Sequence, residues 1–199
     1  MRRFTPTLTP APGELELVQR FANSVQIDTR ADRLRDTAAT LRWLEQNGEP
    51  LAAEPSETER ATLVALRECL REMLAANHVS EQVDRGRAQF AAIAARTPLV
   101  VEPGDDGAFR LEPTGEGALR MAGRIVATIY SAMNDGSWQR LKLCSAGDCD
   151  VAFYDGSKNR SAAWCSMAGC GNREKVRAYQ RRQADARSRQ RLDASRPDA

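Results

Sequence analysis

Apolar residues recur three and four positions apart through most of the first 137 residues, which is the spacing of a helix that buries one face. The first such stretch runs from Glu14 to about Ile27. Its apolar face is formed by Leu15, Val18, Ala22 and Val25. This part of the chain is therefore predicted to be mostly helical.

Capping signals mark where the later helices begin and end. We expect Asp36 to cap a short helix that stops at Gly48. Ser56-Glu57-Thr58-Glu59 has the pattern of a capping box and opens a longer helix. Ser80 is expected to cap a fourth helix, which ends before Pro98. A final helix from about Thr114 to Asn134 is expected to turn inward the apolar residues Leu119, Ala122, Ile125, Val126, Ile129 and Met133.

Before this final helix, the spacing of apolar residues changes from that of a helix to that of a β-strand. Leu99–Val101 and Phe109–Leu111 are short β-prone runs, and Gly104-Asp105-Asp106-Gly107 between them supplies turn residues. The pattern predicts a β-hairpin. The expected fold class is mainly α with a small β-hairpin (α+β), in which a helical N-terminal domain precedes a small C-terminal region.

Four of the five cysteines lie in the last third of the chain as two equally spaced pairs. Cys144 and Cys149 form one C-x4-C pair, and Cys165 and Cys170 form the other. Small residues and glycine separate the thiols, so each loop can turn both sulfurs towards one point. Four thiolates of this kind complete the tetrahedral shell of a structural zinc ion. The spacing therefore predicts one structural Zn²⁺ per chain.

Two disulfides, or four uncoordinated core thiols, are the competing interpretations of the same cysteines. The chain begins Met1-Arg2-Arg3-Phe4-Thr5-Pro6, without the apolar core of a secretory signal. We therefore expect a cytoplasmic protein with reduced thiols, which favours zinc. The fifth cysteine, Cys69, lies in an apolar helical run and is interpreted as a small core residue.

The zinc-binding region holds few apolar residues, with Phe153, Tyr154 and Trp164 as its expected core. Burial alone cannot hold such a region together, and zinc binding, worth about 10–16 kcal/mol in finger peptides, decides whether it folds. We expect the strand Val151–Tyr154 to pair with Ala162–Trp164 in a small hairpin.

The sequence around the second cysteine pair is more specific than its spacing. Residues 141–183 resemble the CGNR zinc finger, which is named for a tetrapeptide found here as Cys170-Gly171-Asn172-Arg173. The other matching segments are Trp164-Cys165-Ser166-Met167, Phe153-Tyr154-Asp155, Ser157 and Asn159-Arg160.

The preceding residues are similar to the ABATE domain that usually comes before such a finger, notably in Phe21-Ala22-Asn23 and Leu41-Arg42-Trp43-Leu44. The family is described as stress-induced transcription regulators, so the resemblance implies a DNA-binding regulator. We expect an ABATE-like domain at 1–137, the finger with a basic C-terminal helix at 138–192, and a disordered tail at 193–199, which has nothing to bury.

Positive charge is concentrated around the finger, although the whole chain carries only +2. Residues 140–199 hold 13 Lys and Arg against 7 Asp and Glu, a net charge of +6, which leaves −4 for the rest. A basic helix expected to start near Asn172 and anchored by zinc is suited to meet DNA phosphates. The residues predicted to contact nucleic acid are Arg160, Arg173, Lys175, Arg177, Arg181 and Arg182.

A solvated helix whose arginines serve solubility is the competing interpretation. The finger would then be a protein-interaction or dimerisation module with a purely structural zinc ion. Val176 and Tyr179 form a narrow apolar stripe that is expected to rest on the finger. The sequence leaves open whether DNA or RNA is bound, and whether the protein forms a homo-oligomer.

Little in the sequence favours an enzyme. His78 is the only histidine, and a position at a helix C-terminus or on the surface is its favoured role. Four thiolates close the zinc shell and leave no position for a reacting water. The protein is therefore not expected to be a catalyst.

The N-terminal domain is expected to sense a ligand or a partner, and its effector is unknown. Asp28, Arg30, Asp32, Arg33 and Arg35 form a charged segment that could line a small-molecule pocket. A solvated loop is the favoured interpretation, because loops are normally charged and exposed. We expect no membrane contact, since no run approaches the 18 or so apolar residues of a membrane span.

Overall fold

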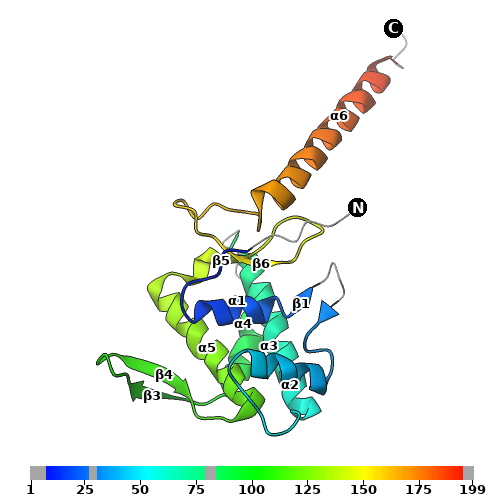
Figure 1. Ribbon diagram of the computed structural model, residues 1–199. Coiled ribbons are helices and arrows are strands. Elements are labelled where there is room, and N and C mark those ends of the chain that lie inside the picture. The colour runs from blue at the N-terminus through cyan, green and yellow to red at the C-terminus, as the bar shows by residue number, and fades with distance from the viewer. Residues whose placement is uncertain (1–7, 27–30, 79–83, 195–199) are drawn as a thin grey trace.

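The computed structural model describes residues 8–26, 31–78 and 84–194 of the 199-residue chain. Helices dominate these ranges, and the described strands pair only in two-stranded antiparallel sheets (Figure 1). This arrangement confirms the expected fold class, a helical N-terminal part followed by a small finger. The α-helices are α1 (Leu15–Ala22), α2 (Thr37–Gln46), α3 (Glu57–Ala76), α4 (Asp84–Ala94), α5 (Gly117–Asp135) and α6 (Asn172–Ala194). The strands are β1 (Val25–Gln26), β2 (Ala31–Asp32), β3 (Leu99–Pro103), β4 (Phe109–Pro113), β5 (Leu141–Leu143) and β6 (Ala152–Tyr154).

The core of the helical body forms where α1, α3 and α5 pack on one another, with α2 and α4 against α3. Cys69 is fully buried there, as expected, and its thiol donates to the Leu66 carbonyl. None of the described helices is long and apolar enough to cross a membrane. The largest fully buried side chains include Phe21, Leu34, Leu44, Leu63, Leu66, Leu70, Leu74, Met121, Ile125 and Ile129.

Local capping signals fix the helix starts that the sequence predicted. The Asp36 carboxylate accepts the Ala39 amide of α2 at 2.6 Å. Ser56 and Glu59 exchange side-chain and backbone hydrogen bonds in the predicted capping box of α3. The predicted cap Ser80 lies outside the described residues. Gly136, with φ +76°, ends α5 in the left-handed conformation that glycine adopts without strain.

The first helix is shorter than its apolar pattern suggests. α1 ends at Ala22, and Val25 lies in β1, opposite Asp32 of β2, so the predicted extension of the helix beyond Ala22 is wrong. Asn23 explains the early stop, because its side chain bonds the backbone of a distant strand and not its own helix. Ile27, the predicted helix end, lies outside the described residues.

Two residues of α5 were assigned to the wrong face. Leu119 and Met133 are 36% and 42% exposed, although the pattern predicted both to point inward. The buried face of α5 carries Ala118 and Met121 together with the predicted Ile125. The true stripe is therefore rotated from the predicted one, because small residues also contribute to it.

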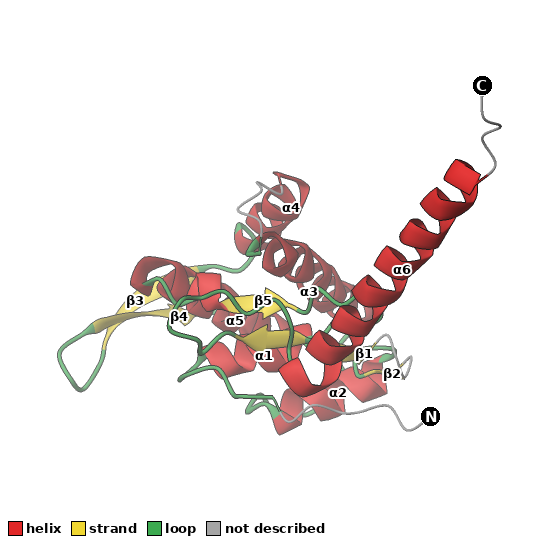
Figure 2. Ribbon diagram, turned by 90° about the horizontal axis from the view of Figure 1, so that it is seen from above, coloured by secondary structure: helices red, strands yellow, loops and turns green. Residues whose placement is uncertain are grey.

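The predicted β-hairpin exists as β3 and β4, paired from Leu99 with Pro113 to Pro103 with Phe109. It extends away from the helices in both views (Figure 1, Figure 2). Val101 and Phe109 are 64% and 74% exposed on it. The hairpin therefore presents apolar side chains to solvent.

The strand pairing of the finger differs from the prediction. β6 pairs with β5, placing Leu141 opposite Tyr154 and Leu143 opposite Ala152, and not with residues 162–164. Leu141 and Ala152 are fully buried in the core of the helical body. Which strand pairs with β6 therefore depends on a surface formed by distant helices, and the local sequence pattern does not indicate it.

Candidate metal centre

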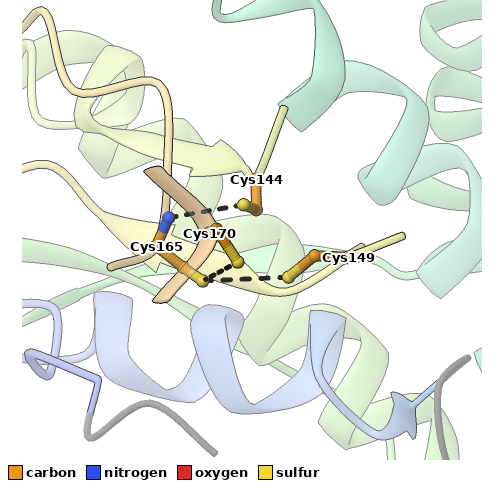
Figure 3. A group of neighbouring side chains, drawn as sticks. All are labelled: Cys144, Cys149, Cys165 and Cys170. Carbon is orange, nitrogen blue, oxygen red and sulfur yellow. Dashed lines mark hydrogen bonds between the residues drawn. The ribbon is translucent and has the colours of Figure 1, made fainter. Parts of the chain in front are cut away.

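The sulfurs of Cys144, Cys149, Cys165 and Cys170 all lie within 4.8 Å of one another. Figure 3 shows the four side chains pointing toward a common centre. The Sγ atom of Cys165 is 3.8 Å from that of Cys149 and 3.6 Å from that of Cys170. A zinc–sulfur bond of about 2.3 Å requires sulfur separations of about 3.8 Å in a tetrahedron. The spacing of the thiols thus fits one structural zinc ion and matches the predicted ligand set.

Backbone hydrogen bonds hold each cysteine in place. Cys144 follows β5, and its amide donates to the Val151 carbonyl at 2.9 Å. The Cys149 amide donates to the Ala146 carbonyl at 2.9 Å and closes a turn. Cys165 donates its own amide to the Cys144 sulfur at 3.4 Å, a contact that moderates the negative charge of a metal-bound thiolate. Cys170 lies in a short π-helix, η2 (Met167–Gly171).

The ionisation of these thiols is mutually dependent. Hydrogen bonds from Cys149 and Cys165 lower the pKa of Cys144 well below its usual range. The hydrogen bond with Cys144 raises the pKa of Cys149, and the hydrogen bonds with Cys144 and Cys149 raise the pKa of Cys165. One thiolate in the cluster therefore disfavours the others, because like charges at this distance repel. Four thiolates coexist once a divalent ion compensates them.

Gly171 and Asn172 of the signature tetrapeptide have structural roles. A Cβ atom on Gly171 would lie 2.4 Å from Met167 Sδ and 3.3 Å from Trp164 Cε3, so a larger residue would displace both. The close neighbours are thus side chains of the finger. Asn172 donates its side-chain amide to the Ala168 carbonyl at 3.3 Å and ties the start of α6 back to the cysteine loop.

A buried ion pair organises the loop between the two cysteine pairs. Lys142 Nζ lies 2.9 Å from Asp155 Oδ2 and 2.6 Å from the Arg160 carbonyl. Asp155 also accepts the amides of Ser157 and Ala162 at 3.0 and 2.9 Å. Burial would raise the pKa of Asp155, but the hydrogen bonds from Lys142, Ser157 and the backbone outweigh it and hold the pKa at about 2. The pair's stabilisation is therefore complete above about pH 4 and is lost as the pH falls towards 2.

Two of the predicted nucleic-acid contacts are paired within the finger itself. Arg173 and Arg177 both bind the Asp148 carboxylate of the first cysteine loop, at 3.0 and 2.9 Å. Arg173 also donates to the Cys170 sulfur at 3.2 Å, and Arg177 to Glu174. These contacts fix the first turns of α6 against the metal centre.

The rest of α6 projects away from the body (Figure 1). Val176 and Tyr179 are 56% and 57% exposed, so the prediction that they rest on the finger is wrong. Lys175, Arg181 and Arg182 are exposed and form no ion pair with any described residue.

Arg160, the remaining predicted contact, is exposed on the loop between the cysteine pairs. Its φ of +52° lies in the left-handed region, which non-glycine residues rarely adopt. The hydrogen bond from Lys142 to its carbonyl supports this conformation.

The residues that join the finger to the helical body were missed by the sequence analysis. Asn23 accepts the Ala152 amide and donates to its carbonyl, both at 2.8 Å. Arg71 of α3 is buried and donates to the Asp150 carbonyl at 3.0 Å. His78 hydrogen-bonds the Leu143 carbonyl. Asn23 lies in the segment that resembles the ABATE domain, which was the one available signal.

Comparison with known families follows the same division of the chain. The ABATE family model, described as "Putative stress-induced transcription regulator", matches residues 15–133. The CGNR zinc finger model matches residues 140–183. No curated protein matches the chain. The ABATE match spans more than half of the 199 residues and is followed directly by the finger. The chain therefore belongs to the ABATE family and carries a C-terminal CGNR zinc finger.

Proposed function

We propose that the protein is a cytoplasmic transcription regulator that binds DNA through α6 and the finger, while the helical body senses a ligand or partner. The observation that carries the proposal is the projection of α6 (Figure 2). A basic helix that buries little against its own protein leaves its surface available to another molecule. The family description supports the regulatory role.

The dimensions and charge of α6 suit double-stranded DNA. Its 23 residues form a rod roughly 35 Å long and about 10–12 Å across, and the major groove is about 12 Å wide. Its exposed part carries Arg181, Arg182, Arg187 and Arg189 against Asp185. A helix that is polar on every side is marginal in isolation. A polyanion that neutralises these arginines would stabilise it.

The basic residues of α6 divide into two groups in this proposal. Arg173 and Arg177 share Asp148, so their first role is to set the direction of the helix. Arg181 and Arg182, together with Lys175, have no such commitment and would meet phosphates. Arg160 would add a contact from the adjacent loop.

We propose no catalytic role for the metal centre. Four cysteine ligands fill a tetrahedral zinc shell and leave no position for a reacting water. His78 already bonds the Leu143 carbonyl. The zinc ion therefore serves to fold the finger.

Fluorescence anisotropy of the zinc-loaded full chain on a labelled DNA duplex, at several salt concentrations, tests DNA binding. Affinity should fall as salt rises, because each phosphate contact releases condensed counterions. Arg181→Ala combined with Arg182→Ala should lower the slope of log K against log salt by about 1.8, or about 0.9 per contact. Arg87→Ala, at an exposed position of α4, is the matched control and should leave the slope unchanged.

Absence of salt-dependent binding by the zinc-loaded protein would contradict the proposal, as would an unchanged slope in the double variant. A single-stranded RNA competitor of equal length separates the two nucleic acids. Stronger competition by the RNA than by unlabelled duplex would replace DNA with RNA as the ligand.

A protein-interaction or dimerisation module is the second candidate function. The exposed Val101 and Phe109 of the β3–β4 hairpin favour it, because apolar residues gathered on a projecting element often mark contact surfaces. Sedimentation velocity of the wild type and of Phe109→Ser distinguishes the two functions. Self-association that Phe109→Ser abolishes, without any DNA binding by the wild type, would favour the interaction module.

A further inference from the structure

The segment after β2 and the helix α2 line a small hollow. Figure 1 shows α2 on the side of the body away from α6. The volume of the hollow is about 180 Å³. Three of its lining residues are arginines, and none of those that the structure describes is acidic. The lining residues are Arg33, Arg35, Ala39, Arg42, Trp43 and Gln46.

The described carboxylates nearest in sequence, Asp32 and Asp36, already have partners. Asp32 accepts both terminal nitrogens of Arg67, at 2.7 and 3.0 Å. Asp36 uses one oxygen to cap α2 on Ala39, and the other lies 3.1 Å from Nε of Arg35. Among the described residues of the charged segment, the acidic side chains are therefore bound, whereas Arg33 and Arg35 line the hollow.

Arg33 and Arg42 are exposed, and their side chains form no ion pair or hydrogen bond with any residue that the structure describes. A guanidinium group presents several N–H donors in a planar fork that matches a carboxylate or a phosphate. The guanidinium groups of Arg33 and Arg42, together with that of Arg35, form a site for an anion.

The inner wall limits what the anion can be. Trp43 and Ala39 are buried and apolar, and the Trp43 ring packs on Phe21 at 5.4 Å between centroids. The wall is therefore apolar and favours a ligand with a short apolar part. Gln46 adds an amide that both donates and accepts. A volume of about 180 Å³ is below the roughly 300–1,000 Å³ of sites for drug-sized ligands, which points to a small molecule.

We propose that this hollow binds a small organic anion bearing carboxylate or phosphate groups, held by Arg33, Arg35 and Arg42 over Trp43. This anion site would be the ligand site of the helical body, so its role in regulation rests on the sensing function proposed above. Binding itself is independent of DNA.

Isothermal titration calorimetry of the zinc-loaded full chain tests the site with two probes, inorganic phosphate and succinate, against a sodium chloride blank of equal ionic strength. We expect saturable binding of at least one probe, and the stronger of the two identifies the preferred group. Arg33→Gln and Arg42→Gln should each weaken binding by about tenfold or more, because each removes a charge-assisted hydrogen bond. Arg181→Gln combined with Arg182→Gln, which alters the proposed DNA surface, should leave probe binding unchanged.

Site-specific evidence comes from the indole N–H resonances of the same protein. The Trp43 signal should shift on titration, while those of Trp138 and Trp164 stay in place. Absence of saturable binding of both probes overturns the site. Wild-type affinity in both Arg33→Gln and Arg42→Gln also overturns it, as does equal weakening of binding by the α6 double variant. Absence of DNA binding would contradict the proposed function but not the anion site, so the two proposals can be distinguished.

Discussion

The helical body and the zinc finger are stabilised by different interactions. In the body, apolar side chains from α1, α3 and α5 form one continuous core, with Phe21, Leu66 and Ile125 fully buried. The buried apolar cluster of the finger consists of Phe153, Ala146 and two of the metal-binding cysteines themselves. We therefore expect burial to be sufficient to hold the first region, and the second to depend on the thiolates and the cation that joins them.

The difference between the regions is sharp, yet they share one sheet. Leu141 and Ala152 of the β5–β6 sheet lie in the core of the body, and Phe153 lies in the finger cluster. Alternate residues of a strand face opposite sides, so a sheet of two short strands serves both regions. The domain boundary predicted at residue 137 can be tested by unfolding experiments.

Loss of one metal ligand is the largest expected effect. Cys165→Ser should reduce zinc well below one ion per chain, because zinc binding supplies about 10–16 kcal/mol of folding free energy in comparable modules. Cys69→Ala, in the body core, is the control and should retain full zinc. Elemental analysis of purified protein measures both. Full zinc occupancy in Cys165→Ser would contradict the four-ligand assignment. Affinity of the wild type should also weaken as the pH falls, because protons compete for the thiolates.

Breaking the buried ion pair of the finger comes next. Asp155→Ala leaves the Lys142 ammonium buried without its carboxylate, which costs about 3–5 kcal/mol. Because folding of the finger is coupled to metal binding, zinc affinity should fall by roughly 10²–10⁴-fold. Competition with a chromophoric chelator measures this change. Adding Lys142→Met to the variant should recover part of the loss, and further weakening would argue against a buried pair.

A smaller effect is expected at the junction of the two regions. Asn23→Ala leaves the Ala152 amide and carbonyl without their side-chain partner, which should lower the free energy of unfolding by about 1–3 kcal/mol. Urea denaturation measures it. Zinc content should stay at one ion per chain, because the described hydrogen bonds of the Asn23 side chain go to Ala152 and not to a cysteine. A loss of zinc in this variant would mean that the body and the finger fold as one unit.

The smallest expected change concerns the partly exposed pairs that orient α6. Asp148→Asn removes the charge that Arg173 and Arg177 share, and such pairs contribute about 1 kcal/mol or less. Thermal unfolding should therefore change little. DNA affinity should change more than stability does, because the direction of α6 depends on this contact. An unaltered affinity would show that the direction of α6 is set by the zinc loops alone.

Features fixed by local chemistry could be predicted from the sequence. The four zinc ligands follow from the spacing of the thiols, and the caps at Asp36 and Ser56 follow from residues within one turn of each helix start. The pairing of β6 with β5 and the roles of Asn23 and Arg71 could not be predicted, because each depends on a surface assembled from distant segments. The periodicity of Val176 and Tyr179 likewise indicates a face without indicating whether anything covers it.

Chelator titration of the full chain, followed by far-ultraviolet circular dichroism together with zinc release, tests the contrast between the two regions most directly. The body holds α1 to α5, and the finger contributes α6. Removal of zinc should therefore reduce the helical signal only by the part that α6 supplies, while cooperative thermal unfolding of the body persists. Collapse of the entire helical signal as zinc leaves would contradict the account.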